Sequence, residues 1–440
     1  MPFANHPRHF CGIMARRIIE TAGGEAVSDA AFQESRVNPE AAVIRDTIPG
    51  RVRWWLLVLL LLVTGSAAIR VYRGVISPEL PKDFVQYWAV GRLFWKGENP
   101  YDPARQLREQ QHVDPERDIA LMMWNPPPAL PLYAPWGLLP ARLAAWLWNG
   151  LQLVAVLAAS YLLVRVYAPG TAWWWFLPLT LGFSGTVWLL LYGQNTGWIL
   201  LGLAGFAWGQ HRGQHWLAGC CGALTVLKPH LLLGFGLVWM GDVWHRGRPR
   251  MALLAGAATV LLITALAHLS DPQVLLHYLT ALREPSPYAV SPKDWMLPAA
   301  SYWLRHYLAP ESMAWQFLPS LLAALTLLLW RLRCRDKWSW PRALPAVVAV
   351  SVLTTGYGGW IFDLPVLLVP LIALAAWMFQ VKPMLLVYLT VWQILVTWAT
   401  FVYGYSLHSF WWVAPAALGP CLVLPFLKTD REIVGIGASV

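Results

Sequence analysis

The feature that most constrains this chain is a series of long apolar runs with almost no charged residues. Residues 54–69 carry no charge, and the last 322 of the 440 residues carry only 27 of the 56 charged ones. A water-soluble fold could not cover its surface with so few charges, so this part of the chain must face lipid. The composition, 57% hydrophobic and 13% charged, excludes a cytosolic enzyme, a secreted disulfide scaffold and a disordered chain. The sequence predicts an all-α polytopic membrane protein.

The net charge of +10 does not indicate a nucleic-acid partner. The basic residues stand in short clusters between apolar runs, where the positive-inside rule places them. The 29 Trp residues are typical of membrane interfaces. The five Cys residues form no CxxC pair and have no His at metal-binding spacing. We therefore expect membrane lipids as partners, and no nucleic acid, cofactor or metal.

Twelve apolar segments predict the membrane domain, residues 51–428. Before it, residues 1–50 are expected to be a disordered cytoplasmic leader, and after it residues 429–440 a cytoplasmic tail. The basic clusters between the segments fall on one side of the membrane under this count. The sequence thus predicts about twelve transmembrane or re-entrant helices with both ends in the cytoplasm. The expected spans are 54–72, 143–166, 173–192, 195–210, 216–227, 229–244, 251–269, 313–332, 342–357, 361–379, 383–403 and 410–427.

This count depends on a break in the apolar stretch 216–244. An unbroken helix would put the basic clusters HRGQH and HRGRPR, which flank the stretch, on opposite sides. Pro229 provides a break, which keeps both clusters inside and places Lys228 outside. Segments 195–210 and 216–227 are shorter than the ~20 residues of a full span. We expect them to be short helices around a water-filled cavity at the outer face.

Residues 73–128 are expected to form a large first extracytoplasmic loop. In KDFVQYWAVGRLFWKGENPYDP, Asp83 opens a segment in which Phe84, Trp88 and Trp95 fall near one helical face. This pattern is typical of an amphipathic helix lying on the membrane. The stretch MMWNPPPALPLYAPWGLLP, at the end of the loop, contains six prolines. They exclude an ordinary membrane helix and predict a re-entrant or interfacial segment.

Ionisable residues inside apolar segments are costly in a membrane and are therefore candidate functional groups. Asp363 in GYGGWIFDLPVLL and Lys228 are the rare examples, and the polar GQN at 193–195 joins two apolar helices. The predicted topology brings these residues and Asp83 to the outer face. Simpler roles stay open for each: a helix start for Asp363, snorkelling for Lys228, and helix capping for Asp83 and the two amides.

An acid, an amide pair and a cation in one cavity match what transfer from a lipid-linked phosphate donor needs. The acid can take the proton of the acceptor hydroxyl, and the cation can hold the phosphate leaving group. We expect Asp83 to be the catalytic base, with Asp102 as the rival acid, although Asp-Pro is also a turn signal. The predicted substrate-binding residues are Lys228, His230, Gln194, Asn195, Asp363, Tyr87 and Asp102.

Five segments of the chain resemble glycosyltransferase family 87. In chain order, the blocks similar to that family are DFVQYWAVGRLFWKGENPYDP, WNPPPALPLYAPWGLLP, LLYGQNTGWILLGLAGFAW, AGCCGALTVLKPHLLLGF and GYGGWIFDLPVLLVPLIAL. The likeness covers about residues 55–380, and the order of the blocks is more specific than any one of them. In the last block, Phe362 stands where the family usually has Tyr.

The resemblance implies a GT-C-type integral-membrane glycosyltransferase. Such an enzyme would take a sugar, typically mannose, from a polyprenyl-phosphate donor and transfer it to a lipid or glycan acceptor with inversion. The reaction would occur at the outer face of the cytoplasmic membrane. The resemblance also implies that the first-loop acid, Asp83, is the catalytic base.

Two other classes of protein stay open. A transporter or flippase of a lipid-linked glycan should have matching broken helices in both halves, whereas breaks occur only near 193–230. A glycan polymerase or ligase of another fold would depend on Arg and His in a late outer loop. The loop 270–312 offers Arg283, Arg305 and His306 for that role. The large first loop opening with an acid favours a transferase over a transporter.

Overall fold

The computed structural model describes residues 49–76, 80–244, 248–334, 337–403 and 406–423. The chain forms two units. The larger unit, Ile48–Ala417, contains almost all of the described residues. Of the smaller unit, Met1–Thr47 with Leu418–Val440, only the end of helix α19 (Val413–Val423) is described. The predicted leader, apart from its last two residues, and the predicted cytoplasmic tail lie outside the described residues.

The described residues are mostly helical, as predicted. Strand-like pairing within them is limited to isolated bridges between Ala120, Ser286 and Ala289. The longer helices are α2 (Gly50–Ile76), α6 (Ala141–Tyr167), α9 (Thr196–His211), α12 (Arg248–Ser270), α15 (Met313–Arg333), α16 (Trp340–Leu353), α17 (Leu368–Val381) and α18 (Met384–Tyr403). The shorter ones are α3 (Phe84–Lys96), α4 (Pro103–Gln111), α5 (Leu130–Tyr133), α7 (Leu177–Gly182), α8 (Ser184–Tyr192), α10 (His215–Gly222), α11 (Leu233–Met240), α13 (Val274–Arg283) and α14 (Ala300–Leu308).

Several of these helices are long and apolar enough to cross a membrane. By length and composition there are five in the part of the chain that the structure describes: Ala141–Tyr167, Arg250–Ser270, Met313–Arg333, Ile361–Val381 and Met384–Tyr403. A sixth span is possible if Trp173–Gly182 and Ser184–Tyr192, bent by 63°, count as one. Helix is present in each of the twelve predicted segments. The fold is that of a multi-pass membrane protein, but the count of twelve spans stays a prediction.

The predicted break next to Pro229 is present. Helix α10 continues into the 3₁₀ turn Ala223–Leu227, and the chain is then non-helical until α11 begins at Leu233. The small residues of AGCCGAL allow α10 to pack closely against α9. A Cβ atom added to Gly205 of α9 would lie 2.6 Å from Cys221 Sγ.

Helix α3 is present as predicted, but two of the three aromatic residues expected to face the membrane pack inside the protein, and only Trp95 is exposed. Phe84 and Trp88 are buried, and the Trp88 indole donates to the Leu139 carbonyl over 2.9 Å. A Cβ atom on Gly91 would lie 2.4 Å from the Tyr133 carbonyl oxygen. The apolar face of α3 therefore packs against the proline-rich segment, which forms only short helical pieces: Pro127–Ala129, α5 and Ala134–Leu138.

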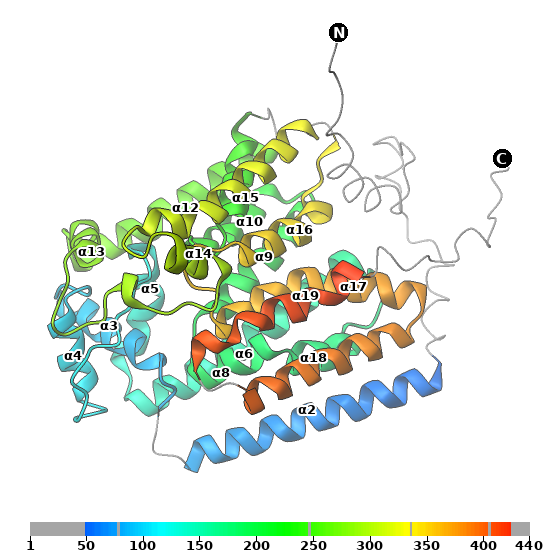
Figure 1. The fold of residues 1–440 in the computed structure, drawn as a ribbon, viewed down its shortest axis with the longest axis horizontal. Coiled ribbons are helices and arrows are strands. Elements are labelled where there is room, and N and C mark those ends of the chain that lie inside the picture. The colour runs from blue at the N-terminus through cyan, green and yellow to red at the C-terminus, as the bar shows by residue number, and fades with distance from the viewer. Residues whose placement is uncertain (1–48, 77–79, 245–247, 335–336, 404–405, 424–440) are drawn as a thin grey trace, which may run out of the picture. The chain divides into compact units, whose positions relative to one another are not determined.

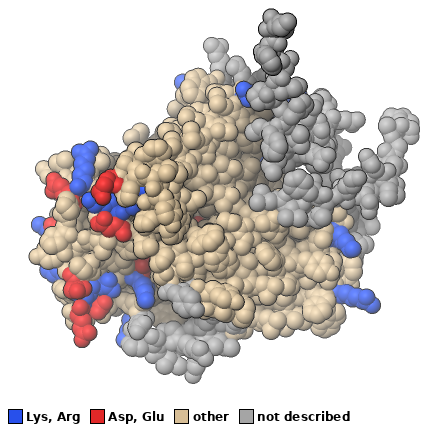
Figure 2. All heavy atoms as spheres, in the orientation of Figure 1, with Lys and Arg blue, Asp and Glu red and all other residues tan. Residues whose placement is uncertain are grey.

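Helices α3, α4, α5 and α13 lie together at one end of the larger unit (Figure 1). The charged side chains gather at this end, whereas the rest of the visible face shows few of them (Figure 2). One buried carboxylate, Glu109 of α4, joins α4 to α3. It forms ion pairs with two residues of α3, Lys96 and, over 2.7 Å, Arg92. This distribution is typical of a polar cap on an apolar membrane domain.

Candidate active site

Four of the predicted polar residues line one cavity of about 140 Å³: Asp83, Gln194, Lys228 and Asp363. They come from four separate segments, namely the start of α3, the turn between α8 and α9, the break before α11, and the 3₁₀ helix Ile361–Leu367. Aromatic rings form much of the remaining wall: Tyr87, Trp124, Trp295, Tyr357, Trp360 and Phe362. The predicted convergence of these four residues in one cavity is therefore present, and its place at the outer face of the membrane stays a prediction.

Asp83 opens α3, but its side chain does not cap the helix. The residue has helical dihedral angles, φ −89° and ψ −15°, and its side chain makes no cap hydrogen bond. Instead, Asp83 Oδ2 accepts a hydrogen bond of 2.6 Å from Gln194 Nε2, and the residue is only 8% exposed. The structure thus does not support simple capping as the role of this acid.

The environment of Asp83, in the loop outside the membrane spans, changes its acidity. Burial raises the pKa of this carboxyl from 3.8 to about 6, because the cavity wall solvates the charged form poorly. The hydrogen bond from Gln194 and the positive charge of Lys228 offset part of this rise, whereas the negative charge of Asp363 adds to it. A carboxyl with a pKa near 6 is suited to act as a base near neutral pH.

Gln194 links the acid to the cation of the site. Its Oε1 accepts hydrogen bonds from Tyr87 Oη over 2.7 Å and from Lys228 Nζ over 2.9 Å, while its Nε2 donates to Asp83. Gly193 allows this close approach, since it has φ +69° and a Cβ atom there would lie 2.9 Å from the Cβ atom of Phe84. Glycine is therefore required before Gln194.

Lys228 is buried rather than snorkelling, with 7% of its surface exposed. Its ammonium group lies 2.5 Å from Asp363 Oδ1 and 3.3 Å from Thr196 Oγ1, besides its hydrogen bond to Gln194. The ring of Phe362 lies 5.5 Å from the nitrogen, within cation–π range. The three N–H donors of the lysine are thus directed at protein oxygens.

Asp363 lies at a helix start, as one reading of the sequence expected, and also pairs with Lys228. Its Oδ2 accepts from the backbone N–H of Trp360 over 3.2 Å, as expected of a residue at a helix start, while its Oδ1 pairs with Lys228. The preceding loop passes very close: Gly358 has φ +75°, and a Cβ atom there would lie 3.1 Å from Asp363 Oδ2 and 3.2 Å from His230 Nε2. His230 lines the same cavity.

The remaining predicted residues have different places. Tyr87 lines the cavity and stacks on Tyr133, with ring centres 4.6 Å apart. The Asn195 side chain donates to the Tyr133 hydroxyl over 2.6 Å, so it helps to fix the position of Tyr133 in this aromatic pair. Asp102 caps α4, because its Oδ1 accepts from the backbone N–H of Arg105 over 3.1 Å. Asp102 therefore has a local structural role, as the Asp-Pro signal in the sequence indicated.

Sequence reasoning missed two sets of residues. One is the aromatic wall of the cavity apart from Tyr87, for which the Trp residues of the WNPPP and GGW motifs, Trp124 and Trp360, were a usable signal. The other is a buried ion pair in the membrane domain between Asp242 and Arg331, whose Oδ1 and Nη2 atoms lie 2.7 Å apart. Trp340 Nε1 also donates to Asp242 Oδ2 over 2.8 Å. No short motif predicts this pair.

Arg283, Arg305 and His306 of the loop 270–312 do not line the cavity that contains Asp83. Arg305 is buried and donates to the Lys293 carbonyl over 2.8 Å, and Arg283 lines a different cavity. His306 packs its ring on Tyr302 of the same helix. Among the described residues, no group of three or more His, Cys, Asp or Glu side chains is placed to hold a metal ion.

The sequence model of glycosyltransferase family 87 matches residues 124–356, more than half of the chain. The chain therefore belongs to glycosyltransferase family 87. The match includes Gln194, Lys228 and His230, whereas Asp83 and Asp363 lie outside it and enter the site through the fold. No curated protein and no solved structure matches the chain. Family and fold together define a multi-pass membrane glycosyltransferase.

Proposed function

We propose that this protein transfers a sugar, mannose in the first instance, from a polyprenyl-phosphate donor to a lipid or glycan acceptor. The reaction takes place at the outer face of the cytoplasmic membrane and inverts the anomeric carbon. The observation that carries the proposal is the Asp83 carboxylate, which is buried in a cavity wall and held there by Gln194 instead of capping its helix.

In the proposed reaction, ionised Asp83 removes the proton of the acceptor hydroxyl as its oxygen attacks the anomeric carbon. The new C–O bond forms on the face opposite the phosphate. The bond from the anomeric carbon to the phosphate oxygen breaks, and its electron pair leaves with the polyprenyl phosphate. One carboxylate is sufficient for this single displacement, so inversion is the expected outcome.

Lys228 is the proposed ligand of the donor phosphate. In the described geometry its three N–H groups point to Gln194, Thr196 and Asp363. One of the two weaker, uncharged partners must give way for the ammonium group to reach a phosphate oxygen, while the bond to Asp363 stays. His230 on the same wall is the second proposed phosphate contact.

The orientation of the site is tested by labelling. The five native cysteines are replaced by alanine, and single cysteines are introduced at the exposed positions Glu116 and Lys382. A membrane-impermeant maleimide applied to intact cells is expected to label position 116 and to leave 382 unlabelled until the cells are opened. Labelling of 382 in intact cells would contradict an outward-facing site.

The activity is tested with purified protein in liposomes. We expect radiolabel from polyprenyl-phosphate [³H]mannose to appear in an acceptor lipid, and an equal amount of polyprenyl phosphate to be released. A transporter or flippase would instead move the intact donor across the bilayer without breaking its glycosidic bond. Movement of intact donor without release of polyprenyl phosphate would therefore overturn the proposal.

A further inference from the structure

A second cavity of about 230 Å³ lies next to the candidate active site. Trp124 lines both cavities. The segment after α13 also serves both, since Lys293 lines the second cavity and Trp295, two residues later, lines the first. The two cavities therefore share one side chain and one loop as their common wall.

The walls of the second cavity are held in place by the protein itself. The backbone N–H of Ala120 donates to the Tyr288 carbonyl over 2.7 Å, which joins the first outer loop to the segment after α13. On the other side, Arg305 donates to the Lys293 carbonyl over 2.8 Å. These contacts hold the segment 284–293 at its middle, through Tyr288, and at its end, through Lys293, so the cavity exists before a ligand arrives.

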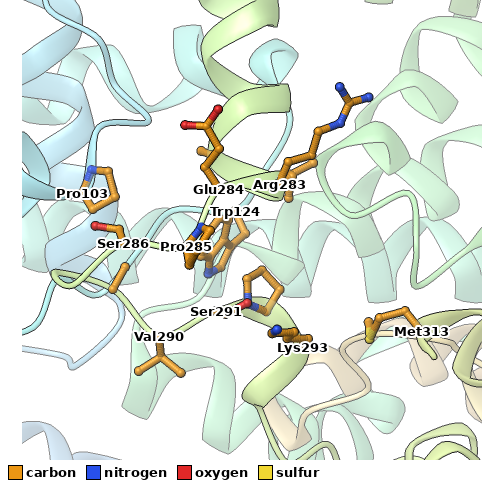
Figure 3. Close-up of a pocket in the computed structure, with 14 residues that line it drawn as sticks. Pro103, Trp124, Arg283, Glu284, Pro285, Ser286, Val290, Ser291, Lys293 and Met313 are labelled. Carbon is orange, nitrogen blue, oxygen red and sulfur yellow. The ribbon is translucent and has the colours of Figure 1, made fainter. Parts of the chain in front are cut away.

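The lining of the second cavity combines an aromatic ring, prolines, hydroxyl groups and one nearby cation. Figure 3 shows Trp124, Pro285 and Ser291 close together with Lys293 beside Ser291, while the charged ends of Arg283 and Glu284 point away from them. An indole face with neighbouring prolines suits the C–H groups of a pyranose ring, and serine hydroxyls suit its O–H groups. The volume is below the ~300 Å³ at which sites for drug-sized ligands begin, so it suits a small ring.

We propose that this second cavity is an acceptor subsite that binds a hexose unit one or two positions away from the reacting hydroxyl. The hexose stacks on Trp124, and the acceptor chain continues past this residue into the cavity that contains Asp83. The proposal rests on the proposed function, since it assigns the second cavity to the acceptor of that transfer. It makes the enzyme selective for acceptors that already carry more than one sugar.

The test measures binding of octyl mannoside, octyl mannobioside and octyl mannotrioside to the full-length protein in detergent. Val290 lines the second cavity and is exposed, so Val290→Trp fills that cavity with little effect on folding. Met296→Trp is the matched control, because Met296 is exposed on the same loop and lines neither cavity. Binding of polyprenyl phosphate is measured separately for all three proteins.

We expect the wild-type protein and Met296→Trp to bind octyl mannobioside, octyl mannotrioside or both about tenfold more tightly than octyl mannoside. Val290→Trp is expected to lose this gain and to bind polyprenyl phosphate normally. Equal affinity for all three probes in the wild type, or an unchanged gain in Val290→Trp, overturns the subsite. Absence of polyprenyl-phosphate binding with the length dependence intact overturns the proposed donor instead, so the two failures are distinguishable.

Discussion

Gln194 Nε2 donates a hydrogen bond of 2.6 Å to Asp83 Oδ2 across 111 positions of sequence. The orientation of this amide is fixed, because its oxygen accepts from Tyr87 and Lys228. A flipped amide would place an N–H group against two donors and an oxygen against a carboxylate. Gln194 therefore connects the candidate base to the cation of the site, with its amide in one orientation.

Asp83 and Asp102 offer a matched comparison, because both precede a helix in the first loop and only Asp102 caps with its side chain. We expect Asp83→Asn to fold normally and to lose at least ~100-fold in turnover, the usual scale for a removed general base. Asp102→Asn should keep nearly full activity, since Asn caps helices about as well as Asp. Turnover is measured as release of polyprenyl phosphate.

Folding of both variants is checked by their thermal unfolding midpoints in detergent. Substantial transfer by a well-folded Asp83→Asn protein would refute Asp83 as the base. Loss of activity in Asp102→Asn without loss of folding would instead favour the rival acid.

The raised pKa of Asp83 predicts a pH dependence. Only the ionised carboxylate can accept the hydroxyl proton, and its pKa is about 6. We therefore expect kcat/KM to rise as the pH increases through about 6 and to be lost below it. An activity that stays constant down to pH 5 would contradict this role of Asp83.

Gln194→Met is expected to move this pH dependence. The hydrogen bond from Gln194 lowers the pKa of Asp83, so its removal raises the pKa further and shifts the acidic limb to higher pH. Asp102→Asn is the control and should leave the limb in place. The measurement is kcat/KM between pH 5 and 8 for the three proteins.

The general layout of this site could be predicted from the sequence because it follows from topology. Charge-poor runs locate the membrane segments, Pro229 locates the break, and the basic clusters suggest which ends share a side. Rare polar residues in apolar segments then identify Lys228 and Asp363 as candidates. Both line the cavity with Asp83, as expected.

The partners of these residues could not be predicted, since they depend on distances set by tertiary packing. An apolar helix face does not reveal whether it meets lipid or protein, which is why α3 was expected on the membrane surface. Asp242 and Arg331 stand near the ends of apolar segments, where single charges are ordinary interface residues. Only the fold brings these two into one buried pair.

That pair yields a prediction about stability. Arg331 and Asp242 are almost fully buried, and Arg331→Met removes the guanidinium group that pairs with the Asp242 carboxylate. Breaking a buried pair in this way costs about 3–5 kcal/mol of folding free energy. We expect a clearly lower unfolding midpoint, with unchanged affinity of the folded protein for polyprenyl phosphate. A changed donor affinity would show that the pair acts on the site.

The ion pair of Lys228 and Asp363 is expected to respond differently, because it lines the cavity. Lys228→Met alone leaves a buried carboxylate unpaired and should destabilise the protein by about 3–5 kcal/mol. In Lys228→Met/Asp363→Asn the charge is removed and the Asn oxygen can still accept from Trp360 N, so most of the stability should return.

If Lys228 binds the donor phosphate, this stable double variant should still bind polyprenyl phosphate at least about tenfold more weakly than the wild type. Restored stability together with wild-type donor affinity would show that Lys228 only neutralises Asp363.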